Sequence, residues 1–180
     1  TASTDVRKMF RGLRFHSLSS GAFNLTVSTP LTAANMRAIR AQMGKYGVNP
    51  SNLFWIVGPI VYQKSILNLA DVITVDKYGQ SAGGLTGELA RWDGIPIIVS
   101  EDCRQDLNAS GVYDGTTKTK TIVVVVNRLA WTLGQRRGVT VKVFNDSRVD
   151  QDKINVSARW DFGAWEGTTV NSEGYIYNIA

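Results

Sequence analysis

The sequence predicts an α+β fold: a compact mixed sheet with flanking helices, extended by a long antiparallel β-hairpin. Two observations lead to this prediction. Short apolar runs alternate with stretches of helical periodicity between residues 22 and 126, and a period-two alternation occupies residues 139–144 and 154–162. Apolar runs bounded by turn residues are typical of buried strands, whereas alternation is typical of strands with one covered face. With 180 residues, 43% of them hydrophobic, the chain can build one domain with an extension.

The first strong element is a helix over residues Thr32–Tyr46. Thr32 can cap its first turn by accepting a hydrogen bond from a free backbone N–H group. Gly47 is expected to end the helix in the left-handed conformation. One face of this helix is apolar, because residues of that kind recur at spacings of three and four: Met36, Ile39, Met43 and Tyr46.

The rest of the compact unit consists of short strands and one further helix. Pro59 favours the first turn of that helix, which runs to Leu67. Two long polar segments, Lys77–Gly87 and Glu101–Lys120, are predicted to be surface loops. The expected strands are Ala22–Ser28, Leu53–Val57, Val72–Val75, Ile95–Ser100 and the valine-rich Thr121–Val126.

The hairpin is predicted from two alternating strands joined by a turn at Asn145–Asp152, which contains three aspartates. Such a hairpin has open edges, which isolated soluble proteins avoid and assembling proteins use. The expected apolar face comprises Val139, Val141 and Val143 on the first strand, with Ile154, Val156, Ala158, Trp160 and Phe162 on the second.

Few residues suited to catalysis are present. Cys103 is the only cysteine and His16 the only histidine, so an intrachain disulfide and a multi-cysteine zinc site are excluded. A Ser-His-Asp relay would need His16, and a Cys-His pair would need both residues. Lone residues of these types are more often packed or exposed than catalytic. We therefore predict that the protein is not an enzyme, and we assign no catalytic, cofactor-binding or metal-binding residue.

The loops contain incomplete ligand-binding motifs. Gly111–Thr119 lacks a lysine directly after its second glycine, and a strand follows it, so a phosphate-binding loop is rejected. The glycine-rich Gly79–Gly87 does not match a dinucleotide-binding pattern. Glu101, Asp102 and Asp106 could gather a divalent cation. Since no calcium-loop pattern is complete, we favour a solvated acidic loop and expect no cofactor.

Five tryptophans are many for this length. Trp92 and Trp131 lie next to predicted strands and Trp160 lies within one, which favours core or interface anchors. Carbohydrate-binding surfaces also use tryptophan, so a lectin-like binding module stays open as an alternative. A hydrolase based on two carboxylates is a third, but no spaced acidic pair requires it.

Charge and hydropathy set further bounds. Lys and Arg outnumber Asp and Glu by 20 to 15, and this scattered excess permits unspecific contact with nucleic acid. No uncharged apolar stretch of about 18 residues occurs, so we predict no membrane contact. Residues Thr1–Arg14 do not resemble a signal peptide, and the initial Thr suggests a processed product or an excised fragment.

The order of motifs along residues 30–180 resembles that of tailed-phage major capsid proteins of the Hong Kong 97 type. The segment Asn49–Val57, followed by a helix, is similar to the region after the first A-domain helix of that family. Leu85–Leu89, leading into Trp92–Glu101, is similar to its variable loop and the strand after it. The Thr121–Val126 strand followed by Gly138–Val143, and the returning Asp150–Phe162, resemble its peripheral-domain (P-domain) strands.

This resemblance implies a division of the chain. Residues 1–20 would link to a spine helix that, with the N-terminal arm and the extended loop, should precede this sequence. Residues 21–132 would form the A-domain, residues 133–168 the P-domain strands, and residues 169–180 would return to the A-domain. The lysine that cross-links some relatives belongs to the missing loop, so no cross-linking residue is carried over.

The resemblance also implies a function. The chain would be a structural major capsid protein that self-assembles into pentamers and hexamers of an icosahedral shell around double-stranded DNA. Its partners would be its own copies, scaffolding, portal and decoration proteins, and packaged DNA contacted without sequence specificity. It would be made in the bacterial cytoplasm and end in the virion. Loops Lys77–Gly87 and Glu101–Lys120 would lie at capsomer contacts.

Overall fold

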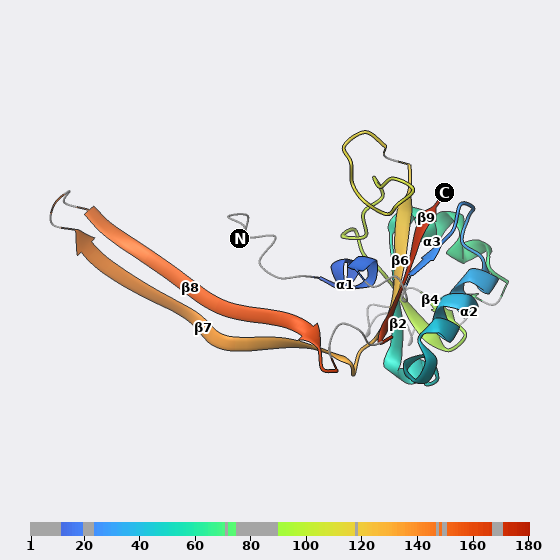
Figure 1. Cartoon of the computed structure of the whole chain (residues 1–180), viewed down its shortest axis with the longest axis horizontal. Coiled ribbons are helices and arrows are strands. Elements are labelled where there is room, and N and C mark those ends of the chain that lie inside the picture. The colour runs from blue at the N-terminus through green and yellow to red at the C-terminus, as the bar shows by residue number, and fades with distance from the viewer. Residues whose placement is uncertain are drawn as a thin grey trace.

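A seven-stranded mixed sheet forms the centre of the described part of the chain, with strand order β1-β9-β6-β2-β5-β4-β3 (Figure 1). The computed structural model describes residues 12–19, 24–70, 72–74, 90–117, 119–146, 148, 151–166 and 171–180, with the backbone alone at 18, 19, 73, 74 and 146. The predicted loop Lys77–Gly87 lies outside these residues. The strands are β1 (Asn24–Thr26), β2 (Leu53–Val57), β3 (Val72–Thr74), β4 (Ala90–Trp92), β5 (Ile95–Val99), β6 (Thr121–Asn127) and β9 (Glu173–Ile179).

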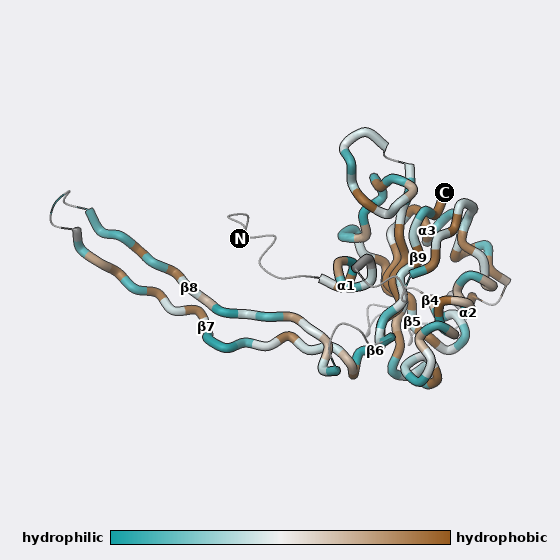
Figure 2. The backbone as a smooth tube through the Cα atoms, viewed as in Figure 1, coloured by the Kyte–Doolittle hydropathy of each residue, from teal (hydrophilic) through white to brown (hydrophobic). Residues whose placement is uncertain are grey.

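We call the seven-stranded sheet, together with the helices and loops packed on it, the body. Its predicted strands are confirmed, in several cases with shorter bounds. β2 pairs with β5 in parallel and with β6 in antiparallel orientation, so it lies in the middle of the sheet. The Thr121–Val126 run is buried on both sides, because Val123 and Val125 face one layer and Val124 and Val126 the other. Figure 2 shows this concentration of hydrophobic residues along the central strands.

Helix α2 (Ala33–Gln42) confirms the predicted helix and its cap, since the Thr32 hydroxyl accepts a hydrogen bond from the Asn35 backbone N–H. The prediction that Gly47 ends it in a left-handed conformation is wrong. The left-handed residue is Gly44 (φ 53°), at the start of the 3₁₀ helix η3 (Gly44–Gly47). Gly47 is needed for space instead, because a Cβ atom there would lie 2.4 Å from the Arg40 carbonyl oxygen.

One face of the sheet is covered by α2 and by helix α3 (Pro59–Lys64), which begins at the predicted proline. The predicted continuation to Leu67 is the separate 3₁₀ turn η5 (Ile66–Asn68), and a similar turn, η4 (Pro50–Asn52), precedes β2. Met36 and Ile39 of α2 and Val61 of α3 are fully buried against Trp55 and Ile97 of the sheet. This layer is the main hydrophobic core.

The opposite face is covered by helix α1 (Leu13–Ser19) and by the Glu101–Lys120 segment. The sequence predicts a polar surface loop here, yet two residues of the segment, Cys103 and Leu107, are buried against Val124 and Tyr175. A backbone bridge between Leu107 and Lys120 closes its base. The segment is therefore partly core, and α1 is an element for which the sequence carried no signal.

The predicted hairpin is present as strands β7 (Trp131–Asp146) and β8 (Gln151–Ala164), which among the described strands pair only with each other. It is inserted between β6 and β9, which are antiparallel neighbours in the sheet. Figure 1 shows it projecting far from the body as a separate two-stranded ribbon. Within the described residues, no helix is both long and apolar enough to cross a membrane.

Candidate interaction surface

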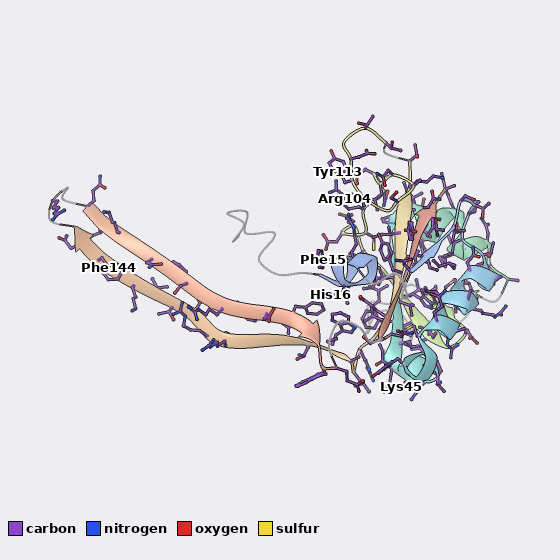
Figure 3. The ribbon with its side chains drawn as sticks, viewed as in Figure 1. Phe15, His16, Lys45, Arg104, Tyr113 and Phe144 are labelled. Atoms are coloured by element: carbon purple, nitrogen blue, oxygen red, sulfur yellow. The ribbon has the colours of Figure 1, made fainter. Side chains whose placement is uncertain are left out.

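The base of the hairpin is fixed to the body by stacked rings. Trp131 at the start of β7 stacks on Phe162 of β8, with ring centroids 5.1 Å apart and an interplanar angle of 15°. The His16 ring of α1 packs against the other side of this pair, 5.2 Å from Trp131. Figure 3 shows Phe15 and His16 at this junction. The direction in which the hairpin leaves the body is therefore set by aromatic packing with α1.

A buried carboxyl group lies in the same region. Glu173 at the start of β9 is only 1% exposed, and α1 packs against β9. Burial raises the pKa of Glu173 from its ordinary value of 4.5 to about 8, and the nearby Ser17 hydroxyl opposes this rise. The carboxyl group is consequently mostly protonated at neutral pH, so burying it costs little charge desolvation.

A second set of contacts ties the segment that directly follows β8, at the base of the hairpin, to the body. The Glu166 carboxylate accepts a hydrogen bond from the Tyr46 hydroxyl, and its Oε2 lies 3.5 Å from Lys45 Nζ. The Tyr46 hydrogen bond and the Lys45 charge lower the pKa of Glu166. Beside this contact is a cavity of about 270 Å³ lined by Leu129 and Trp165. These contacts hold the hairpin base from the side opposite α1.

One face of the hairpin is apolar and uncovered. Val141 pairs with Val156 and Val143 with Ile154 across the two strands, so their side chains share this face. All four side chains are well exposed, from 59% at Val141 to 67% at Ile154. The opposite face carries pairs such as Lys142–Asn155 and Thr140–Ser157. The predicted alternation is confirmed, but no described residue covers the face that it predicts to be buried.

The two hairpin strands differ in length because β7 contains two register shifts, one between Gln135 and Arg137 and one between Arg137 and Thr140. Each adds one residue to β7 relative to β8. A single shift would turn the apolar residues of β7 to the other side of the ribbon, and the second shift restores them. The apolar face therefore continues from Trp131 and Leu133 at the base to Val143 near the tip.

The two residues that could have served nucleophilic catalysis have structural surroundings. His16 packs against Phe15 and Trp131, whereas Cys103 lies in the cluster with Leu107 and Tyr175. Burial, aided by the Asp102 charge, raises the pKa of the Cys103 thiol to about 11. A thiol of this kind is a poor nucleophile at neutral pH.

The three acidic residues considered as possible cation ligands, Glu101, Asp102 and Asp106, do not converge. Asp106 forms a two-pronged ion pair with Arg104, at 2.8 Å for each contact, while Glu101 and Asp102 are exposed. Among the described residues no group of three or more His, Cys, Asp or Glu side chains is arranged to hold a metal ion. The neighbouring Gly111–Thr119 turn is instead shaped by the Asp114 carboxylate, which accepts hydrogen bonds from the Thr116 and Thr117 N–H groups.

The tryptophans separate into core and surface residues. Trp55 and Trp92 are fully buried and meet edge to face at 6.2 Å. Trp160 on the hairpin is 39% exposed and Trp165, just after β8, is 73% exposed. Trp165 is not among the tryptophans that the sequence predicts to be anchors. Its position directly after the alternating strand was the available signal for an exposed anchor at the hairpin base.

Solved phage structures have the same arrangement, and two of the three that follow are capsid structures. The chain superposes on a protein of the bacteriophage PhiM1 mature capsid with a TM-score of 0.53 at 13% identity, covering 87% of this chain and 51% of the other. For the capsid structure of cyanophage P-SCSP1u the TM-score is 0.52 at 15% identity, over 92% of this chain and 59% of the other. For a Mycobacterium phage Che8 structure the TM-score is 0.50 at 18% identity, covering 90% of this chain and 54% of the other.

These similarities concern three-dimensional structure alone. No protein-family model and no curated protein sequence matches the chain. The chain spans between half and three fifths of the length of the three structures above. Because 87–92% of this chain is covered, the matched region includes parts of both the body and the hairpin. The chain therefore has, over that part, the same fold as these phage structures, which agrees with the Hong Kong 97-type capsid fold that the sequence resemblance implies.

Proposed function

We propose that this chain is the body and hairpin portion of a phage capsid subunit that assembles with its own copies into an icosahedral shell. The observation that carries the proposal is the long hairpin with an uncovered apolar face on a capsid-type fold. An isolated two-stranded ribbon is at best marginally stable in water, and three or more strands or a packed helix are needed to stabilise it. A protein with this shape is suited to being completed by neighbouring chains.

The proposal includes the form of the shell. Copies would meet as pentamers and hexamers enclosing double-stranded DNA, with the body nearer the capsomer centre and the hairpin linking around it. Residues 21–132 would act as the A-domain, with 133–168 as the P-domain strands and 169–180 returning to the A-domain after a linker at 1–20. The Glu101–Lys120 segment would lie at a capsomer contact, as would Lys77–Gly87.

The further partners follow from the same role. Scaffolding, portal and decoration proteins would bind the assembled subunits, and packaged DNA would touch scattered Lys and Arg side chains. The subunit would be made in the bacterial cytoplasm and end in the virion. Its part would be mechanical rather than catalytic, which agrees with the buried Cys103 and the structural packing of His16.

Sedimentation of the native gene product from its source tests the proposal, with detection by an antibody against this chain. We expect recovery in particles of megadalton mass, and imaging of those particles should show a lattice of capsomers. Recovery only as a small soluble species would contradict a shell role.

A lectin-like binding module is the second candidate, and the exposed Trp165 beside the 270 Å³ cavity is the observation that favours it. Exposed tryptophan next to a hollow can stack on a sugar ring. This function requires a stable monomer that binds glycans, with Trp165 at the site. A glycan array probed with wild-type chain and with Trp165→Ala would distinguish it, since a shell protein should give no tryptophan-dependent signal.

A further inference from the structure

Three arginines gather in the middle of the hairpin, where β7 is bulged. Arg137 lies directly opposite Arg159, and Arg136 and Arg159 line the same open groove. All three side chains are exposed. Like charges in directly opposed positions destabilise a β-ribbon. We call Arg136, Arg137 and Arg159 the arginine cluster.

The arginine cluster has no carboxylate partner among the described residues. Arg137 donates a hydrogen bond to the Ser157 hydroxyl at 2.9 Å, which leaves its charge uncompensated. Asp161 lines the same groove, but its Oδ1 accepts a hydrogen bond from the Phe162 backbone N–H. Three cations next to one carboxylate leave a net positive patch that would favour an acidic partner.

The body carries the complementary feature at the turn after β5. Glu101 and Asp102 are adjacent and exposed, and in the described part of the chain neither carboxylate forms an ion pair or a hydrogen bond. In the part of the body that the structure describes, the other exposed Asp and Glu side chains are engaged: Asp93 with Arg40, Glu166 with Lys45 and Tyr46, and Asp114 with backbone N–H groups. We call Glu101 and Asp102 the acidic turn.

The two features cannot meet within one molecule. The acidic turn lies at the end of the sheet where β6 begins, whereas the hairpin leaves from the end of β6. The seven residues of β6 alone separate them by roughly 20 Å, and the hairpin then carries Arg136 further away. Figure 1 shows the hairpin and the segment around Tyr113, labelled in Figure 3, projecting in different directions.

We propose that the acidic turn of one copy binds the arginine cluster of a second copy of this chain. This inference rests on the proposed shell function and specifies one of its contacts. The two surfaces differ, so the contact is heterologous and each copy offers one of each. Repetition around an axis closes such contacts into a ring, which is the geometry of a pentamer or hexamer.

Charge reversal in the full-length gene product tests the contact. The first variant carries Arg136→Glu with Arg159→Glu, the second Glu101→Lys with Asp102→Lys, and the third all four substitutions. We expect each double variant to lower particle recovery about tenfold or more, and the fourfold variant to restore most of it, because the attraction is re-established with opposite signs. Lys142→Glu with Arg128→Glu, two exposed cations outside the cluster, should leave recovery unchanged.

The outcomes separate this contact from the shell function. Particles recovered equally well from both double variants would overturn the contact while leaving the shell function intact. A fourfold variant that is folded, by its unfolding midpoint, yet is not rescued would also overturn it. If the arginine variant forms normal particles with less nucleic acid, the cluster faces nucleic acid instead. If the wild-type product forms no particles, the proposed function fails, and this contact with it.

Discussion

At the scale of single residues, the most consequential side chain is the protonated carboxyl group of Glu173. Its pKa of about 8 in the folded chain is above its ordinary value of 4.5 because burial disfavours the charge. A group of this kind contributes its full stability below pH 4.5. That contribution declines as the pH rises and is lost above about 8, since the unfolded chain releases the proton more readily.

The first prediction concerns Glu173→Gln. The free energy of unfolding of the wild-type chain, from urea titrations, should fall between pH 5 and pH 8, whereas that of the variant should fall less. The free energy of unfolding of the wild-type chain should fall relative to that of the variant by about 3 kcal/mol over this range. Comparison at each pH cancels the other titrating groups. Equal pH slopes for both proteins would show that Glu173 is ionised in the folded chain.

A second prediction concerns Gly174, the next residue of β9. A Cβ atom there would lie 2.6 Å from Ile39 Cγ1 of α2 and 2.9 Å from Val125 Cγ1. Gly174→Ala should therefore destabilise the chain by about 1–3 kcal/mol, through overpacking between helix and sheet. Gly163→Ala is the matched control, because a Cβ atom at this β8 position meets nothing within 4 Å. Ile39→Ala removes the Cγ1 atom, so in thermal melts it should cost less stability in the Gly174→Ala background than in the wild-type chain.

At the scale of elements, the hairpin shows what alternation can and cannot establish. The period of two predicted both strands and identified the face with Val141 and Ile154. It also predicted that this face is half-buried, and the described chain leaves it open. Sequence periodicity reports which residues share a face, but the covering surface can belong to another chain.

The third prediction uses neighbouring positions on opposite faces of β8. Val156→Asp introduces a charge on the apolar face, and Asn155→Asp introduces the same charge on the polar face. Because both residues are exposed in the single chain, both variants should unfold within about 0.5 kcal/mol of wild type. In the full-length product, only Val156→Asp should lower particle recovery by sedimentation. Equal recovery from both would mean that the apolar face is not an assembly surface.

At the scale of the whole molecule, the body and hairpin are energetically distinct. Both hydrophobic clusters are built from body residues, and Trp131 is the one hairpin residue among those packed against them. Thr132 and Gly163 are direct cross-strand partners, so a short turn can join them. The body therefore contains the contacts needed to fold without the projecting part of the ribbon.

The fourth prediction follows from this separation. Replacing residues 133–162 by a short Gly-Ser turn should leave a cooperatively folded body with a melting temperature close to that of the parent chain. The same deletion in the full-length product should abolish particle formation and leave a small soluble species. An unfolded body, seen by circular dichroism, would mean that the hairpin is part of the folding unit.

The sequence was sufficient for the fold class because the valine run of β6 and the alternation of β7 and β8 are strong local signals. It was insufficient where distant segments meet. The placement of α1 against Trp131 and the burial of Leu107 depend on tertiary contacts. The arginine cluster was likewise invisible, because Arg137 and Arg159 are 22 positions apart in the sequence and become opposed only through the register of the hairpin.

The paired register shifts of β7 also restrict how this hairpin can change during evolution. One inserted or deleted residue between Gln135 and Thr140 would rotate every later β7 side chain by half a turn, placing Val141 and Val143 beside the charged residues. Two such changes together would preserve the face while altering the curvature of the ribbon. Length variation among homologues at this site should therefore occur in even numbers, and each step would alter the arc along which neighbouring copies are placed.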